Sequence, residues 1–282
     1  MKKYTLGLYE KAMPNTLTIP EKLALTAKCG FDRMEISIDE TDAKLSRLDY
    51  SDAQMLEIAR ASQDAGVPIS TMCLSGHRKY PFGSHDAATV RKSLEIMEKA
   101  LCFGATIGVK IIQLAGYDVY YEEHDAGTEE RFCENLEKAA LMAASYGIVL
   151  GFETMETPFM DTTQKAMKYV RQVNSPYLGV YPDIGNLKNA AVLYGTDVVE
   201  DLHTGNGHIF AAHLKETRPG VYRDMTFGSG GHTEYERCIS ELWNQGVRMY
   251  TGEFWHLGSE SYEQDIREAA CFLRSKIDPF VK

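Results

Sequence analysis

Four polar residues in the second half of the chain each close a short apolar run. Consecutive members of this set lie about 30 to 40 positions apart, which is the length of one strand, one helix and two loops. The spacing therefore predicts consecutive βα units, and it constrains the fold more than any other feature of the sequence. The residues are Glu153 (ending 149–153), Asp183 (178–183), His213 (209–213) and Glu253 (249–253).

The alternation of strand-like and helical segments extends over the whole chain. The apolar runs are apolar at nearly every position, which is typical of parallel strands that are buried on both faces. Helix caps and glycine stop signals bound the segments between them. The expected strands are 4–8, 33–38, 69–74, 110–114, 149–153, 178–183, 209–213 and 249–253, and the expected helices are 18–29, 51–65, 86–103, 129–146, 163–172, 190–202, 235–245 and 262–277.

These repeats predict a closed (β/α)8 TIM barrel of the α/β class that forms a single domain over residues 1–282. No linker or composition break interrupts them, and the length is close to the roughly 250 residues typical of such barrels. An open doubly wound sheet is the alternative, but no glycine-rich dinucleotide motif follows the first strand. In a barrel, the four polar residues would meet at the C-terminal rim, where such enzymes carry their chemistry.

Composition narrows the class of protein. A net charge of −10 argues against a nucleic-acid or anionic-membrane surface. The six cysteines form no C-x-x-C pair, which indicates reduced thiols in a cytosolic protein. The first residues lead directly into a strand, and no apolar run is long enough to span a bilayer. We therefore expect a cytoplasmic protein without a membrane or nucleic-acid partner.

Three carboxylates and one imidazole at strand ends suit a divalent cation. Taken singly, each of the four residues could be a loop residue or a helix cap, but barrel geometry directs all of them at one pocket. The mostly hard oxygen set favours Mn²⁺ or Mg²⁺ and leaves Zn²⁺ and Co²⁺ open. Cysteine is absent from the set, so a structural zinc site is not expected.

Glu153 and Glu253 suggest the chemistry of this site. If they face each other across a bound sugar, one can remove a proton from carbon while the other returns a proton on the opposite face. A chelated metal would stabilise the enediolate between these steps. This arrangement suits ketose 3-epimerisation or, with different proton delivery, aldose–ketose isomerisation.

Several polar residues are candidates for binding the substrate. Ser75, His77 and Arg78 follow the third expected strand and would suit an anionic group such as a sugar phosphate, although a solvated basic turn is the alternative. Lys215 comes two residues after His213, so the alternation of side chains along a strand would place both on the same side. Glu156 is a candidate to orient a ligand or a substrate hydroxyl.

Other residues at strand ends have two readings. Glu35 in the second strand could face the site or be a buried hydrogen-bonding group at the barrel mouth. Rim aromatics would serve packing more often than sugar contact, and they are Tyr9, Tyr117, Tyr120, Tyr121, Trp255 and His256.

Long stretches of the sequence resemble the L-xylulose-5-phosphate 3-epimerases. These enzymes are also named L-ribulose-5-phosphate 3-epimerases or putative hexulose-6-phosphate isomerases, and they belong to the xylose-isomerase-like barrels. The resemblance spans nearly the whole chain. It is carried by GLYEKA (7–12), DETDAKLSRLD (39–49), MCLSGHR (72–78), QLAGYDVYY (113–121), YPDIGN (181–186) and HLKETRPG (213–220).

The resemblance implies a metal held by the four strand-end residues, with the two glutamates as the acid/base pair. It implies a phosphorylated ketopentose as substrate, in the degradation of L-ascorbate or L-xylulose, and a homodimer. Relative to D-tagatose 3-epimerases, Asn186 replaces a common histidine, and it is a sixth candidate for binding the substrate. Lys215 and Arg218 lie near the place of a substrate-binding arginine. These departures agree with a change from free sugar to sugar phosphate.

We therefore predict the interconversion of L-xylulose 5-phosphate and L-ribulose 5-phosphate. The nearest rival is an aldose–ketose isomerase acting on a hexulose 6-phosphate. A DNA-repair nuclease on the same barrel is disfavoured by the acidic charge balance, and a non-catalytic binding barrel is the third alternative.

Overall fold

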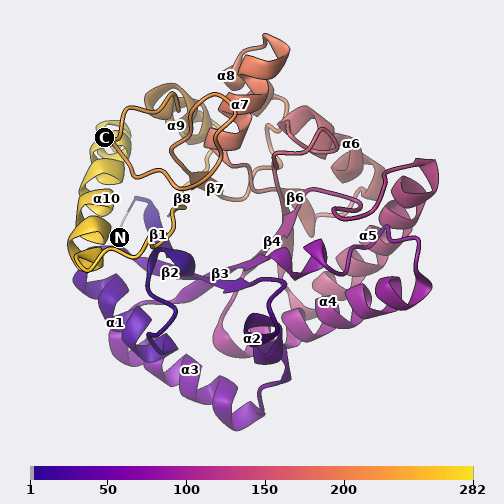
Figure 1. Ribbon diagram of the computed structural model, residues 1–282, viewed down its shortest axis with the longest axis horizontal. Coiled ribbons are helices and arrows are strands. Elements are labelled where there is room, and N and C mark those ends of the chain that lie inside the picture. Colours follow the sequence, from indigo (N-terminus) through magenta and orange to yellow (C-terminus); the bar gives the residue numbers. More distant parts are fainter. Residues whose placement is uncertain (1–2, 282) are drawn as a thin grey trace.

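Eight parallel strands form one sheet in the computed structural model, which describes residues 3–281 (Figure 1). Each strand is three to six residues long and is buried along most of its length. They are β1 (Thr5–Tyr9), β2 (Arg33–Ile38), β3 (Ile69–Leu74), β4 (Ile111–Ala115), β5 (Val149–Glu153), β6 (Leu178–Val180), β7 (Ala212–Leu214) and β8 (Met249–Gly252).

The sheet closes into a barrel, as the sequence predicts. The strands pair in the order β6-β5-β4-β3-β2-β1-β8-β7. Two isolated parallel bridges, Val180 with Ile209 and Asp183 with His213, then join β6 to the β7 segment. The amide of Val180 donates to the carbonyl of His208 at 2.8 Å, which supports this closure. The fold is a TIM barrel, and an open doubly wound sheet is excluded.

Helices surround the barrel, and most begin and end where local signals place them (Figure 1). Ser51 caps α3 through a capping box, and Gly66 ends it with φ 64°. The helices are α1 (Ile19–Lys28), α2 (Asp42–Leu45), α3 (Asp52–Ala65), α4 (Ala87–Ile107), α5 (Ala126–Tyr146), α6 (Thr163–Val173), α7 (Ile184–Tyr194), α8 (Val198–His203), α9 (Tyr235–Asn244) and α10 (Tyr262–Ile277).

Three expected helices are wrong in their bounds. The helix expected at 129–146 begins earlier, at Ala126, because the side chain of Asp125 caps it. The helix expected at 86–103 continues through Gly104 and ends at Gly108, whose φ of 102° only glycine adopts easily. The helix expected at 190–202 is two helices, because Gly195 ends α7 in the left-handed region with φ 66°. Asp197 then accepts hydrogen bonds from the amides of Val199 and Glu200 and starts α8.

A buried arginine fills part of the barrel interior. Arg33 on β2 is 1% exposed, and its guanidinium donates to Thr71 and Thr251 at 2.8 Å each. Gly7 on β1 leaves room for it, because a Cβ there would lie 2.6 Å from Arg33 Nη1. The interior of the barrel is therefore partly polar, because Arg33 forms hydrogen bonds with threonines of β3 and β8.

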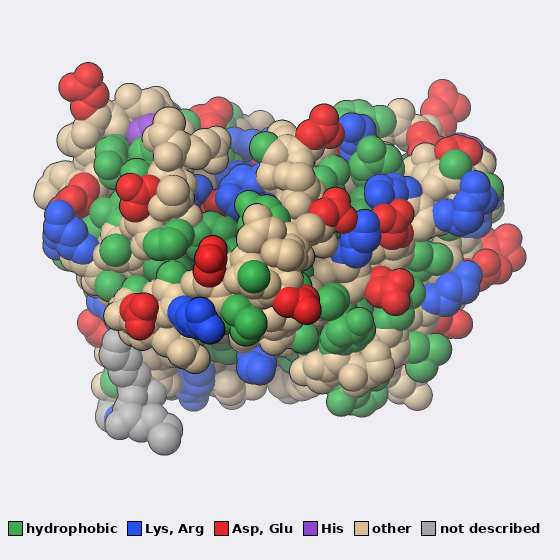
Figure 2. Space-filling view, turned by 90° about the horizontal axis from the view of Figure 1, so that it is seen from below, with side chains coloured by type: hydrophobic (Ala, Val, Ile, Leu, Met, Phe, Trp, Pro, Cys, Tyr) green, Lys and Arg blue, Asp and Glu red, His purple; other side chains and the backbone are tan. Residues whose placement is uncertain are grey.

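The outer surface agrees with the mixed composition. Acidic and basic side chains are interspersed over the face shown in Figure 2, without a continuous basic track. Within residues 3–281, no helix has the length and apolar character needed to cross a membrane. All six cysteines are free; Cys29, Cys73 and Cys238 are buried, and Cys102 and Cys271 are exposed.

Candidate active site

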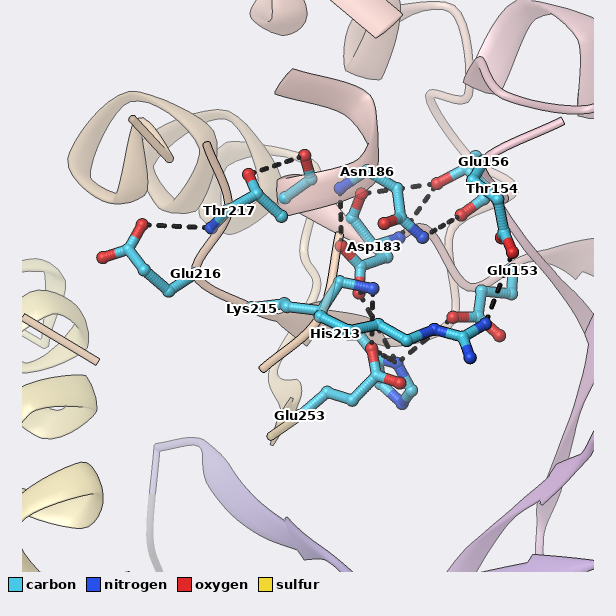
Figure 3. Close-up of polar contacts among 12 residues, drawn as sticks. Glu153, Thr154, Glu156, Asp183, Asn186, His213, Lys215, Glu216, Thr217 and Glu253 are labelled. Atoms are coloured by element: carbon cyan, nitrogen blue, oxygen red, sulfur yellow. Dashed lines mark hydrogen bonds and ion pairs between the residues drawn. The ribbon is translucent and has the colours of Figure 1, made fainter. Parts of the chain in front are cut away.

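The four strand-end residues of the sequence converge on one buried point at the C-terminal rim (Figure 3). Glu153, Asp183, His213 and Glu253 each offer a ligand atom, and these atoms lie within 4.8 Å of one another. Their chain positions are up to 100 residues apart, so only barrel closure brings them together. Together they form what we call the acidic cluster.

The barrel positions the four residues in different ways. Glu153 is the last residue of β5, His213 lies within β7, and Glu253 directly follows β8. Asp183 lies beyond β6 and is the N-cap of α7, where its Oδ1 accepts from the amide of Asn186 at 2.8 Å. The capping bond fixes the carboxylate and leaves Oδ2 turned toward the other three residues.

His213 is oriented by a carboxylate behind it. Its Nε2 lies 2.5 Å from Glu35 Oε1, and the Tyr181 hydroxyl donates to Glu35 Oε2 at 2.8 Å. Its Nδ1 faces the cluster, 3.1 Å from Glu253 Oε2. Of the two roles that the sequence allowed for Glu35, the structure supports that of a buried hydrogen-bonding group. A carboxylate behind a histidine is the usual way to fix the tautomer of a metal ligand.

Lys215 lies inside the acidic cluster. Its Nζ is 3.0 Å from Asp183 Oδ2 and 3.1 Å from Glu253 Oε2, and the side chain is buried. Lys215 directly follows β7, and its side chain faces the same carboxylates as that of His213. Because its charge is already paired with these carboxylates, its first effect is to offset their mutual repulsion.

The two glutamates have pKa values that differ strongly. Burial and the neighbouring Glu253 carboxylate raise the pKa of Glu153 to about 8. Burial opposes ionisation of Glu253 too, but Lys215 and His213 hold the pKa of Glu253 well below its usual range. Paired groups with divergent pKa values suit one acid and one base.

The donor set fits a divalent cation. Three carboxylates and one imidazole supply hard oxygen ligands and one nitrogen, and they are already gathered in a buried place. Two of these ligands are fixed from behind by the α7 capping bond and by Glu35. The cluster could therefore hold one metal ion.

A pocket opens from the acidic cluster toward solvent. Its lining includes Glu153 and Glu253 together with Ser75, Arg78, Glu156, Asn186 and Lys215, five of the six predicted substrate-binding residues. Asn186 is 2% exposed; its Nδ2 donates to the Thr154 carbonyl at 2.8 Å, whereas its Oδ1 accepts no hydrogen bond from the described residues. That oxygen is available to a hydroxyl group of a ligand.

The expected role of His77 does not fit its position. The ring is buried against Phe82, with ring centroids 4.4 Å apart, and Nε2 lies 3.1 Å from the Ser93 carbonyl. It does not line the pocket, and burial lowers the pKa of His77 to about 4. A neutral, buried imidazole cannot supply the charge that was expected of it.

Sequence reasoning missed two basic residues of the pocket, Lys11 and Arg223. Arg223 belongs to the long segment between β7 and α9, which has no periodic pattern to place its side chains. The length of that segment was the available signal, because long loops in compact domains are often functional. Tyr9 and Trp255, expected as packing aromatics, pack on each other with centroids 6.1 Å apart and also line the pocket.

Comparison with known proteins identifies the family. The xylose isomerase-like TIM barrel pattern matches residues 23–276. An L-ribulose-5-phosphate 3-epimerase (UlaE) of Escherichia coli strain SMS-3-5 / SECEC is 40% identical over 277 residues, covering 98% of this chain and 96% of its own. The chain belongs to this epimerase family. A UlaE protein of Salmonella paratyphi A has the same identity and coverage. The protein is accordingly an isomerase of the carbohydrate epimerase type.

Solved structures support the fold of this family member. The D-psicose 3-epimerase of Clostridium cellulolyticum H10, in a structure with D-tagatose, superimposes with a TM-score of 0.80 at 17% identity, covering 97% of this chain and 99% of that one. An L-ribulose 3-epimerase gives a TM-score of 0.79 at 14% identity, covering 99% of this chain and 96% of that one. At such identities the likeness establishes the barrel and not the substrate.

Proposed function

We propose that the protein is a metal-dependent 3-epimerase that interconverts L-ribulose 5-phosphate and L-xylulose 5-phosphate. The observation that carries this proposal is the pair of glutamates, Glu153 from β5 and Glu253 after β8, within one buried cluster that could hold a metal. The substrate comes from the relatives named L-ribulose-5-phosphate 3-epimerase. A place in L-ascorbate or L-xylulose breakdown in the cytoplasm would follow from that substrate.

Glu153 and Glu253 would move the proton at C3. One carboxylate removes the proton from C3 of the ketose, and the other, on the opposite side of the sugar, returns a proton to the other face. Lys215 and His213 lie beside Glu253 and favour its ionised form more than that of Glu153. The reaction is then reversible with the two roles exchanged.

Glu153, Asp183, His213 and Glu253 would hold the cation. A divalent metal at this place supplies electrostatic stabilisation for the negative charge that develops on the substrate oxygens. Behind the cluster, Glu35 keeps the imidazole of His213 turned toward it at a fixed angle.

The lining of the pocket suits a phosphorylated ketopentose. Asn186 Oδ1 and the Glu156 carboxylate offer acceptors for sugar hydroxyls, and Ser75 and Arg78 offer donors to an anion. Lys215 would contact the substrate close to the acidic cluster, because its Nζ lies about 3 Å from two of the cluster carboxylates. Tyr9 and Trp255 would cover apolar C–H faces of the sugar.

The test is product analysis by NMR in deuterated water. With L-ribulose 5-phosphate and a divalent metal, we expect L-xylulose 5-phosphate carrying deuterium at C3, and activity lost on chelation should return with metal. Deuterium at C1 or C2 with an aldose product would instead establish the aldose–ketose isomerase. Failure to turn over any ketose phosphate in the presence of metal would refute the proposal.

A further inference from the structure

The barrel interior holds an arginine whose charge is not explained by stability. Arg33 on β2 is 1% exposed, and its guanidinium donates to three neutral oxygens, the hydroxyls of Thr71 and Thr251 and the carbonyl of Tyr250. Its Nε has no hydrogen-bond partner among residues 3–281. A buried charge that is held by neutral oxygens and not by a carboxylate is costly. An apolar side chain would fill this space at lower cost, so the charge of Arg33 needs another explanation.

The strand ladder explains how Arg33 reaches across the barrel. Gly7 on β1 pairs with Arg33 on one side and with Thr251 on the other. A Cβ at Gly7 would lie 2.6 Å from Nη1 and 2.7 Å from Cζ of Arg33. The guanidinium therefore occupies the space that a side chain at position 7 would fill, and it crosses β1 to donate to a hydroxyl on β8.

A row of hydrogen bonds leads from this hydroxyl to the acidic cluster. Thr251 Oγ1 lies 2.6 Å from the hydroxyl of Tyr181, which donates to Glu35 Oε2 at 2.8 Å. Glu35 Oε1 lies 2.5 Å from Nε2 of His213. These four side chains are fully buried, so solvent does not compete for their hydrogen bonds. We call Arg33, Thr251, Tyr181 and Glu35 the relay.

The guanidinium gives the relay a direction, because it carries donors and no acceptor. Thr251 Oγ1 accepts from Arg33, so its single hydrogen points to Tyr181, and Tyr181 gives its own hydrogen to Glu35. In the opposite direction, a hydroxyl hydrogen of Thr251 would face the guanidinium, which cannot accept it. Glu35 is then an acceptor at both oxygens. The hydrogen of the 2.5 Å contact belongs to Nε2 of His213, and Nδ1 keeps its lone pair.

Two neighbours of the relay bear on this assignment. Thr71 pairs with Glu35 in the β2–β3 ladder, accepts from Arg33 at 2.8 Å and hydrogen-bonds to Glu35, which gives a shorter connection in the same direction. The amide nitrogen of Gln113 lies 3.2 and 3.3 Å from the two ring nitrogens of His213. At such equal distances Gln113 does not select between the nitrogens, so the selection falls to Glu35.

We propose that Arg33 is a positioning residue for His213, because it fixes the direction of the relay and so leaves Nδ1 free to bind a divalent cation. This inference rests on the proposed function for the presence of that cation in the acidic cluster. Arg33 is not among the residues that line the pocket or form the cluster. An effect of Arg33 on cation binding must therefore pass through Glu35.

The first arm of the test is calorimetric titration of chelator-treated protein with Mn²⁺, without sugar. Arg33→Lys keeps the charge but loses the fork that reaches two threonines, and Thr251→Val keeps the shape but removes the hydroxyl. Each should weaken Mn²⁺ affinity by about 3- to 10-fold, the effect of one buried hydrogen bond. If Arg33→Lys does not fold, Thr251→Val tests the same connection.

The control for this arm is another buried threonine. Thr26 on α1 is also fully buried, and its hydroxyl donates to the carbonyl of Lys22 at 2.7 Å. Thr26→Val should lower the urea midpoint, as Thr251→Val does, but it should keep the wild-type Mn²⁺ affinity. Wild-type affinity in both Arg33→Lys and Thr251→Val would overturn the proposal.

The second arm asks whether Arg33 acts through Glu35. In the Glu35→Gln background the relay is already cut, so Arg33→Lys should weaken Mn²⁺ affinity less than twofold further. The same loss in both backgrounds would mean that Arg33 acts by loosening the barrel, and the relay would be wrong.

The third arm is proton NMR of the Zn²⁺-loaded protein. The Nε2 proton of His213 should resonate far downfield because of its short hydrogen bond to Glu35. Thr251→Val should move this resonance upfield, whereas Thr26→Val should leave it in place. An unchanged resonance in Thr251→Val would contradict the relay.

The outcomes separate this inference from the proposed function. If the relay variants lose Mn²⁺ affinity but wild-type protein turns over no ketose phosphate, the relay stands and the proposed function fails. If the protein epimerises L-ribulose 5-phosphate and the variants bind Mn²⁺ as wild type does, the relay is wrong and the proposed function stands. A wild-type protein that binds no divalent cation would overturn both.

Discussion

Two buried clusters of charged residues lie beyond the C-terminal ends of the strands, and their charge balance is opposite. In the first, three basic side chains surround the carboxylate of Glu10. We call these four residues, Glu10, Lys22, Lys44 and Arg47, the basic cluster. In the second, the acidic cluster, three carboxylates share one permanent cation, Lys215, and one histidine. The two clusters contain the same kinds of charged side chain, but they differ in their capacity to bind a further ion.

The basic cluster has its hydrogen-bonding capacity filled. Glu10 Oε1 accepts from Lys22 at 2.8 Å, Lys44 at 2.5 Å and Arg47 Nη2 at 2.8 Å. Glu10 Oε2 accepts from Arg47 Nη1 and from the amide of Ser37, each at 2.8 Å. The carboxylate joins the β1 end to β2, α1 and the segment around α2, so its role is structural.

The acidic cluster keeps capacity for a cation. Asp183 Oδ2 accepts no well-aligned hydrogen bond from residues 3–281, although Lys215 Nζ lies 3.0 Å away, and the pKa of Asp183 is raised to about 7 mainly by burial. An excess of buried carboxylates is unfavourable unless protons or a metal offset it. In this protein, the cluster with excess positive charge is structural, and the cluster with excess carboxylates has capacity to bind a cation.

The largest effect is expected in the acidic cluster, on chemistry. Glu253→Gln removes one of the two proposed proton carriers and should lower kcat by about 10²- to 10⁴-fold and stop C3 hydrogen exchange with solvent. NMR of the sugar phosphate in deuterated water measures both. Glu95→Gln on the surface of α4, where Glu95 pairs with Lys99, is the matched control and should exchange normally. Wild-type epimerisation by Glu253→Gln would remove the glutamate pair from the mechanism.

The second-largest effect is expected in the basic cluster, on the stability of the fold. Glu10→Gln leaves two buried lysines and one partly buried arginine without their anion and should lower the free energy of unfolding by about 3 to 5 kcal/mol, measured by urea denaturation. Glu263 also contacts two cations, Lys28 and Arg267, but at the surface. Glu263→Gln should therefore change the midpoint little. Equal effects of the two substitutions would contradict the structural role of Glu10.

A smaller effect is expected behind the acidic cluster. Glu35→Gln removes the charge that orients His213 and should weaken affinity for a divalent cation by about 10- to 100-fold. Calorimetric titration with Mn²⁺ measures this affinity. Tyr181→Phe removes only the hydroxyl that donates to Glu35 and should have a weaker effect of the same sign. Unchanged affinity in Glu35→Gln would show that Glu35 does not position the histidine.

The smallest effect concerns acid stability. Burial alone would raise the pKa of Glu10, but Arg47, Lys44 and Lys22 hold it well below its ordinary value of 4.5. The unfolded chain therefore takes up this proton first, so the stabilising contribution is present above pH 4.5 and is lost as the pH falls further. Urea midpoints of wild type and Glu10→Gln should converge as the pH is lowered from 4.5 toward 3. A constant difference would contradict this linkage.

Periodic features of this chain could be predicted from the sequence, and irregular ones could not. Strand-end residues such as Glu153 and Glu253 were placed correctly, because a barrel directs strand ends at one rim. His77 was misplaced because it lies in a short 3-10 turn, Ser75–Arg78, where sequence spacing does not tell which way a side chain points. Arg223 was missed because its segment has no periodic pattern, and long-range contacts such as those of Asn189 with Gly220 and Val221 fix the backbone before it.

The sequence by itself determined the barrel, the identity of the four clustered residues and the family, because these depend on spacing and on long matching motifs. Tertiary structure alone decided which charges are paired. It placed Lys215 among the carboxylates, turned Glu35 onto His213 and left Arg78 and Arg223 with weak contacts at the pocket mouth. The physical reason is that electrostatic pairing depends on distances of a few ångströms between residues far apart in the chain, which no local pattern encodes.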